Sequence, residues 1–297
     1  MTSPVADLAA GPEERLPERL LALAERFTRH NDALRMVRIG ERAPATAVLD
    51  HVSLTRELAH QTGDLHEAVY QLPLHHPGDG RDARIRLRHL AHLTTEAAEH
   101  LIDAGDAIDR ARDETTAIEE VFVPHRHMPR SADDRLVLAR DLTALGPRTC
   151  AETAHTVTAE MVRLATVHPH LARHTSVAAF LRYKPTGLSA TQNHALHAIA
   201  AGHVTISTRH SRSRSRVTNR TGLTLATLRS LENRGLLHRE LLPRTTTEHR
   251  LHLTAAGRTA LTSAAVHQAP RAPVSARPAQ AAAPVPSVSE LQGGVRR

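Results

Sequence analysis

The chain has 297 residues, enough for one or two domains, and carries 38 Lys and Arg side chains against 31 Asp and Glu, a net charge of +7. A single cysteine, Cys150, excludes an intrachain disulfide framework and a cysteine-rich zinc site. No stretch is apolar enough for a membrane span, and the first residues lack a signal-peptide pattern, so we expect a cytoplasmic protein. Aromatic residues make up only 2%, so we expect a core of Leu, Val, Ile and Ala, which suits helices.

The sequence pattern in the first part of the chain predicts a series of helices. Apolar residues recur at steps of three and four, which places them on one face of a helix. Four such series begin at Leu16, Leu54, Leu87 and Cys150, and the third continues to Phe122. We predict an all-helical bundle or helical hairpin over residues 1–183. The third series has the length of a coiled-coil seam, so its face belongs either to an intramolecular core or to a homodimer through these N-terminal helices.

The charge divides along the chain. Residues 1–183 carry 22 basic and 27 acidic side chains, whereas residues 184–268 carry 12 basic and only 3 acidic ones. An acidic region joined to a compact basic region is typical of a protein that binds a polyanion through its basic part. Residues 269–297 are rich in Ala and Pro and basic, and we expect a disordered tail there.

The basic module, residues 184–268, shows a repeated alternation of helix and hairpin. Ser189 and Gln192 have the spacing of a capping box, and Gly202 can end the helix that they begin. A β-branched strand over residues 203–208 follows, then an Arg/Ser-rich hairpin returning at residues 217–218. A second helix over residues 224–234 ends at Gly235. Residues 236–241 and 248–253 form a second hairpin, the wing, and Thr254 caps a last helix.

This stretch resembles the winged helix of MarR-type transcription regulators. The matching parts are the opening LSATQ (residues 188–192), the helix end LENRGLL (231–237) and the LTAAG that follows the wing (253–257). The resemblance covers about 80 residues and implies a DNA-binding winged-helix fold. One departure is that such regulators place a helix before the recognition helix, where this chain has its Arg/Ser hairpin.

The module offers two kinds of DNA contact. The helix over residues 224–234 presents small polar residues opposite its leucines, a pattern that lets a helix enter the major groove. We predict groove contacts for Thr224, Thr227, Ser230 and Arg234. Arginines in the hairpin and the wing are predicted to contact phosphates, and the alternative for the hairpin is a solvated loop. The predicted phosphate contacts are Arg209, Arg212, Arg214, Arg216, Arg220, Arg244 and Arg250.

Motifs of catalysis and metal binding are missing from the sequence. It has no Gly-rich phosphate loop, no Gly-x-Ser-x-Gly elbow and no His-Glu-x-x-His. Cys150 lies in an apolar series, so we expect it to be buried. The 23 histidines, among them His89 with His92 and His168 with His170, are expected to be surface residues without a metal.

Together these features predict a mostly α protein, with a long-helix bundle, then an α+β winged helix, then a disordered tail. The predicted function is non-catalytic binding of double-stranded DNA in transcription regulation, without a cofactor, in the cytoplasm or on the nucleoid. The first alternative is a scaffold whose bundle and winged helix bind proteins. The second is an enzyme with an unrecognised site in the helical region.

Overall fold

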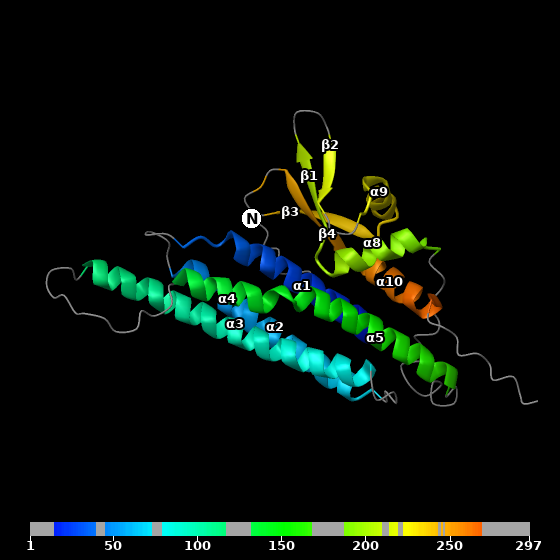
Figure 1. Ribbon diagram of the computed structural model, residues 1–297, viewed down its shortest axis with the longest axis horizontal. Coiled ribbons are helices and arrows are strands. Elements are labelled where there is room, and N and C mark those ends of the chain that lie inside the picture. The colour runs from blue at the N-terminus through cyan, green and yellow to red at the C-terminus, as the bar shows by residue number, and fades with distance from the viewer. Residues whose placement is uncertain are drawn as a thin grey trace, which may run out of the picture.

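The computed structural model describes residues 15–39, 45–72, 79–116, 132–167, 187–209, 214–218, 222–242, 245 and 247–268. Within these residues, five helices come first and a mixed helix–strand region follows, as Figure 1 shows. The helices are α1 (Leu16–Met36), α2 (Thr46–Tyr70), α3 (Asp79–Thr116), α4 (Ala132–Ala144), α5 (Gly146–Val167), α8 (Ala190–Ala200), α9 (Leu225–Asn233) and α10 (Ala255–Gln268). The strands are β1 (Thr205–Arg209), β2 (Arg214–Thr218), β3 (Leu237–Leu241) and β4 (Glu248–Leu253).

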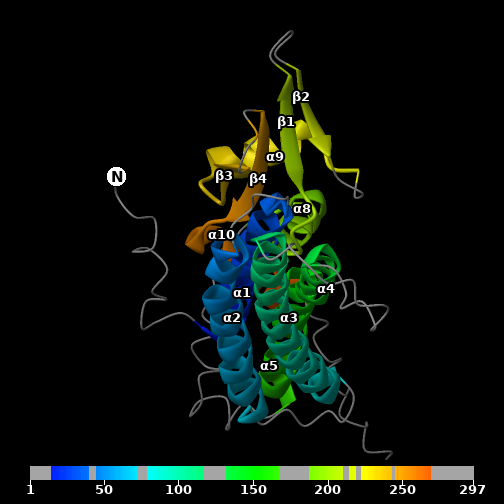
Figure 2. The same cartoon turned by 90° about the vertical axis from the view of Figure 1, so that its left-hand side faces the viewer.

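The predicted helical bundle is confirmed. Its helices run roughly along the long axis of the molecule, with α1 and α5 between the α2–α3 pair and the sheet (Figures 1 and 2). The apolar series of α3 is buried within the single chain, where Leu87, Leu101 and Ala104 are fully inaccessible. The intramolecular explanation of this series is therefore the one that the fold uses. Ile118 and Phe122, at the end of the predicted series, lie outside the described residues.

The start of α5 packs closely against a side chain of α1. A Cβ atom on Gly146 would lie 2.4 Å from the Phe27 ring, so only glycine fits where α5 begins. Phe27 itself is fully buried in the main apolar cluster. Among the described residues, no helix is long and apolar enough to cross a membrane.

A four-stranded antiparallel sheet, with strand order β2-β1-β4-β3, forms the second part of the molecule. The wing hairpin pairs Leu237 with Leu253 and Leu241 with His249. The returning strand is longer than predicted, because β2 begins at Arg214 and pairs with β1 over five residues. Since α8, the β1–β2 hairpin, α9, the wing and α10 follow in the predicted order, the predicted fold class is confirmed. The predicted tail, residues 269–297, lies outside the described residues.

One apolar cluster joins the bundle to the winged helix. Leu20 of α1 and Val157 of α5 belong to the same cluster as Leu196 of α8, Leu231 of α9 and Leu253 of β4. A second, smaller cluster lies within the bundle, around Leu34, Leu101 and Leu136. The two regions of opposite charge therefore share a core, although the predicted boundary at residues 183–184 lies outside the described residues.

Candidate nucleic-acid interface

Helix α9 has one apolar and one polar face, as predicted. Leu228 and Leu231 are fully buried, and Leu225 packs against the same cluster. Thr224 is the N-cap, and its hydroxyl accepts a hydrogen bond from the Thr227 backbone N–H at 3.2 Å. Gly235 has a φ of +68°, the left-handed conformation that favours glycine at a helix end. These caps fix where the polar face of α9 begins and ends.

The outermost residues of α9 are Ala226, Arg229 and Asn233, all of which are exposed. Their spacing of three and four puts them on one stripe, on the side away from Leu228 and Leu231. Sequence reasoning named Thr227 and Ser230 as groove contacts but missed Arg229. The same three-and-four rule that identified the apolar face would have found it.

Ser230 and Arg234 lie beside α8 instead of at the centre of this stripe. Gln192 Nε2 donates to Ser230 Oγ at 3.1 Å, and Arg234 donates to Gln192 Oε1 at 3.4 Å. The Ser189 backbone N–H donates to the same Oε1 at 3.0 Å, which completes the predicted capping box of α8. Gln192 therefore ties the start of α8 to the end of α9.

The β1–β2 hairpin places three of the predicted arginines on one face. Arg209 lies opposite Arg214, and Ser207 lies opposite Arg216. Ile206 and Val217, at the alternating positions, are the pair that packs against the core. Because successive residues of a strand lie on opposite faces, Arg209, Arg214 and Arg216 occupy positions on one face of the hairpin, the face on which Thr205 lies opposite Arg250 of β4. Arg212, Arg220 and Arg244 lie outside the described residues.

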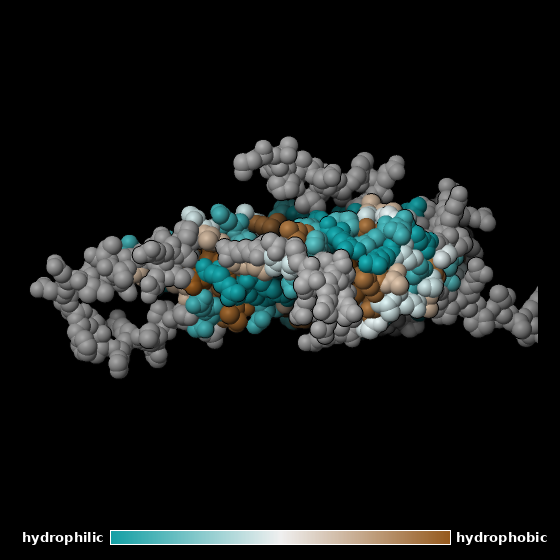
Figure 3. Space-filling model, turned by 90° about the horizontal axis from the view of Figure 1, so that it is seen from above, coloured by the Kyte–Doolittle hydropathy of each residue, from teal (hydrophilic) through white to brown (hydrophobic). Residues whose placement is uncertain are grey.

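Basic residues outnumber acidic ones around α9 and the hairpin, where Glu248 of β4 lies exposed opposite Ser207 of β1. The sequence has no acidic residue between Glu160 and Glu232, a stretch that includes α8, β1, β2 and most of α9. Glu232 is itself paired with Arg239 of β3, whose second guanidinium nitrogen donates at 2.6 Å. Seen from the sheet side, hydrophilic residues cover much of the coloured surface, with smaller apolar areas between them (Figure 3). This surface therefore favours an anionic partner.

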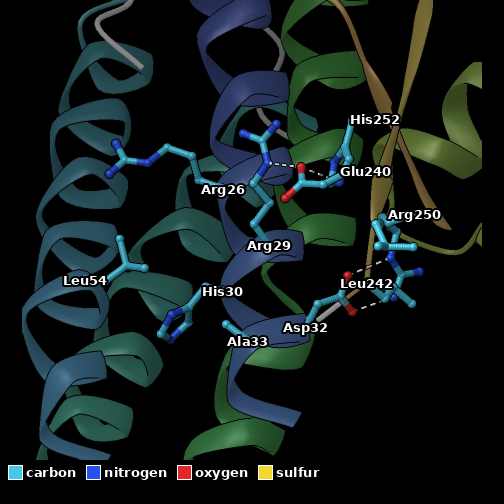
Figure 4. A pocket seen from close by; sticks show the side chains of 11 residues that line it. Arg26, Arg29, His30, Asp32, Ala33, Leu54, Glu240, Leu242, Arg250 and His252 are labelled. Carbon is cyan, nitrogen blue, oxygen red and sulfur yellow. Dashed lines mark hydrogen bonds and ion pairs between the residues drawn. The ribbon is translucent and has the colours of Figure 1, made fainter. Parts of the chain in front are cut away.

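The prediction for Arg250 is wrong. Its side chain is buried, donating to Asp32 Oδ2 at 2.8 Å and Oδ1 at 2.5 Å, and to the Gly202 carbonyl at 2.9 Å. An arginine held in this way on the inner face of β4 does not reach a DNA phosphate. It joins the wing to α1 instead, as Figure 4 shows.

A second polar cluster also connects α1 to the wing. Arg29 donates to Glu240 at 2.8 Å and pairs with Glu25, also at 2.8 Å. His252 is stacked on His238, with 5.3 Å between ring centroids. Burial lowers the pKa of His252 to about 3 and raises the pKa of Glu25, the latter opposed by Arg29 and Arg258.

This cluster does not make a metal site. Among the described residues, no group of three or more His, Cys, Asp and Glu side chains is arranged to hold a metal ion. Cys150 is fully buried, as predicted, and burial raises the pKa of its thiol. His92 is exposed and paired with Glu96 at 3.4 Å, whereas His168 and His170 lie outside the described residues.

Comparisons of the chain with protein-family models, with curated protein sequences and with solved structures found no match. The function must therefore be inferred from the site itself.

Proposed function

We propose that the chain binds double-stranded DNA without catalysis, as a transcription regulator. The observation that supports this most is the polar stripe of α9, Ala226, Arg229 and Asn233, on a helix whose one acidic residue, Glu232, is paired with Arg239. A stripe that combines a small residue with Arg and Asn suits the major groove, where Arg recognises guanine and Asn recognises adenine. As a regulator it would act in the cytoplasm, on the nucleoid.

The hairpin supplies the second part of the proposal. Arg209, Arg214 and Arg216 occupy one face of β1–β2, at the end of the molecule farthest from the α2–α3 pair (Figures 1 and 2). Such a row would follow a sugar-phosphate backbone and displace condensed counterions from it. The acidic bundle on the other side would be kept away from the DNA by repulsion.

A salt series tests this proposal. We expect the full-length protein to bind a fluorescent random-sequence duplex with an affinity that falls steeply as salt rises, measured by anisotropy. Replacing Arg212, Arg214 and Arg216 together by Ala should weaken binding to all duplexes alike. It should also make the slope of log affinity against log salt shallower, by up to about 3.

The matched control replaces Arg81, Arg88 and Arg110, on α3 of the bundle, by Ala and should leave the slope unchanged. An absence of binding at low salt would refute the DNA proposal and favour the scaffold alternative. An unchanged slope in the hairpin variant would refute the role of the hairpin alone.

A homodimer through the N-terminal helices belongs to the same proposal. It has to use surfaces other than the α3 apolar series, which is buried within one chain. Ile85 of α3 and Val137 of α4 are about half exposed, at 54% and 47%, and are open to such a contact. Sedimentation equilibrium decides this point, because a mass of one chain at all concentrations would exclude the dimer.

A further inference from the structure

Three arginines gather at the carboxyl end of α1. Arg140 of α4 donates to the Leu34 carbonyl at 2.9 Å and to the Val37 carbonyl at 2.7 Å, so its guanidinium caps the last turn of α1. Arg35 belongs to that turn, and Arg38 directly follows the C-cap residue Val37. These three residues, Arg35, Arg38 and Arg140, form the α1-end cluster. It lies apart from the polar stripe of α9 and has no part in the contacts described for that helix.

The cluster carries more positive charge than its surroundings neutralise. Arg35 is mostly exposed and pairs with Asp32 at 3.1 Å, but Asp32 already binds the buried Arg250. Arg38 is exposed and has no ion-pair partner among the described residues. The carboxyl end of a helix offsets only about half of one positive charge. This end of the bundle is therefore basic, although residues 1–183 as a whole carry more acidic than basic side chains.

Like charges are held close together within the cluster. Burial, and then the nearby guanidiniums of Arg38 and Arg35, lower the pKa of Arg140, whereas Asp133 of α4 raises it. The repulsion between the guanidiniums costs free energy in the folded protein, and an anion bound beside them would offset that cost. A guanidinium presents its N–H donors in a planar fork that matches the oxygens of a phosphate group. The cluster therefore suits a phosphate.

The cluster lies on the same side of the sheet as the arginine face of the hairpin. Thr205 of β1 lies opposite Arg250 of β4, and Arg250 is bonded to Asp32 of α1. From this contact, β1 continues to Arg209 on the face of Thr205, and α1 continues for one turn to Met36. The hairpin rises from the bundle, whereas α1 runs along it (Figure 1). Two basic surfaces therefore diverge from one contact.

We propose that the α1-end cluster is a further phosphate contact for double-stranded DNA, made by the bundle itself and not by the winged helix. The inference rests on the proposed function. Since DNA carries one negative charge per about 1.7 Å of its axis, a duplex that extends past the hairpin offers phosphates along its whole length. The exposed Arg35 and Arg38 donate to them, and Arg140 adds its charge while it caps α1. Such a contact reads no sequence, but it fixes the direction of the duplex across the protein.

The first test measures the binding of the full-length protein to a fluorescent random-sequence duplex by anisotropy across a salt series. The double variant Arg35→Gln/Arg38→Gln should bind several-fold more weakly than the wild type. Its slope of log affinity against log salt should be shallower by about 2, because each lost phosphate contact removes about 0.9. The matched control, Arg81→Gln/Arg88→Gln, removes the same charge from exposed positions in the first half of α3 and should keep the wild-type slope.

A second test locates the DNA without relying on affinity. Cys150 is the only cysteine of the chain and is fully buried, so a cysteine introduced on the surface is the reactive thiol. Iron–EDTA attached to Asp133→Cys, an exposed position beside Arg140, should cleave the bound duplex. The same reagent on Asp64→Cys should not, because this exposed position lies in the half of α2 that is away from the end of α1 (Figure 1).

Circular dichroism establishes that each variant is folded, and if the double variant does not fold, the cleavage experiment decides. A wild type that binds no duplex at low salt would overturn the proposed function, and the cluster contact with it. A wild type that binds, together with an Arg35→Gln/Arg38→Gln variant of unchanged slope, would overturn the cluster contact alone. Cleavage from Asp133→Cys no stronger than from Asp64→Cys would have the same meaning.

Discussion

Asp32 and Arg250 show how one charged pair fixes the position of the wing. Both side chains are about nine-tenths buried, and their two hydrogen bonds form a planar fork. Removing one partner leaves the other charge buried and uncompensated, which costs more than the pair itself contributes. The strength of this contact depends on the presence of both residues.

We therefore predict that Asp32→Asn lowers the free energy of unfolding by about 3–5 kcal/mol. Urea denaturation followed by circular dichroism measures this change. The control is Asp109→Asn, an exposed position on α3, which should change it by less than about 0.5 kcal/mol. Equal midpoints for the two variants would show that the buried pair does not stabilise the protein.

At the scale of the elements, α9 carries exposed residues on one stripe and residues that contact α8 on another. Arg229 and Asn233 are exposed, whereas Ser230 accepts from Gln192 of α8. We predict that Arg229→Ala or Asn233→Ala changes the preferred DNA sequence, at a cost of about 1–3 kcal/mol for the preferred site. Selection of duplexes from a random pool measures the preference.

Ser230→Ala serves as the control for this prediction. It should keep the sequence preference and lower stability by about 1 kcal/mol, the value of one hydrogen bond. The opposite pattern, with preference changed by Ser230→Ala and not by Arg229→Ala, would mean that the face beside α8 is the reading face.

The first turn of α10 touches the end of the wing strand that follows α9. A Cβ atom on Gly257 would lie 2.1 Å from the Leu236 carbonyl oxygen, a backbone atom that cannot move aside easily. Thr254 accepts from the Gly257 N–H at 3.0 Å and donates to the Gly235 carbonyl at 2.7 Å. The LTAAG motif thus fastens α10 beneath the turn that ends α9.

We predict that Gly257→Ala lowers the melting temperature by several degrees, because a clash of this kind costs about 1–3 kcal/mol. Gly63→Ala is the control, since no atom lies within 4 Å of a Cβ there and alanine is the better helix former. Its melting temperature should stay the same or rise. A Gly257→Ala variant as stable as the wild type would mean that the α10 contact relaxes freely.

Across the whole molecule, buried histidines link stability to pH. Burial lowers the pKa of His30 and His252 to about 3 and of His197 to about 4. His197 packs against His155 of α5, and His252 lies near Glu25 of α1, so both contacts cross from the winged helix to the bundle. These groups are neutral in both states above pH 6.5, but below it the unfolded chain binds protons that the folded one does not.

We therefore predict that stability falls as the pH is lowered from 7 to 5, by about 2 kcal/mol for each of these histidines at pH 5. Urea denaturation at both pH values measures the loss. His252→Gln should reduce the pH dependence, while His92→Gln, an exposed position, should not. A stability that is constant between pH 7 and 5 would contradict the burial of these histidines as neutral groups.

Features set by neighbouring residues could be predicted from the sequence, whereas contacts between residues far apart in the sequence could not. Helix positions, the Ser189–Gln192 capping box and the glycine helix ends at Gly202 and Gly235 follow from local rules, and the structure confirms them. Arg250 could not be placed, because its partner Asp32 is 218 residues away and the side of β4 that it faces depends on where α1 packs. The contact of Ser230 with Gln192 could not be predicted for the same reason, because the two residues are 38 positions apart in the sequence. The helices and strands were predicted correctly. The site residues were predicted wrongly where their positions depend on how these elements pack against one another.

The apolar cluster that runs from α1 and α5 into α8, α9 and β4 has a consequence for how such a chain can change over time. A winged helix with a core of its own can be exchanged between proteins as a unit, because cutting the chain at its boundary uncovers little. Here a cut between the bundle and α8 would expose Leu196, Ile199 and Leu253 on one side and Leu20 and Val157 on the other. Recombination that separated the two regions would leave an exposed apolar surface on each piece, and substitutions in one region are constrained by the packing of the other.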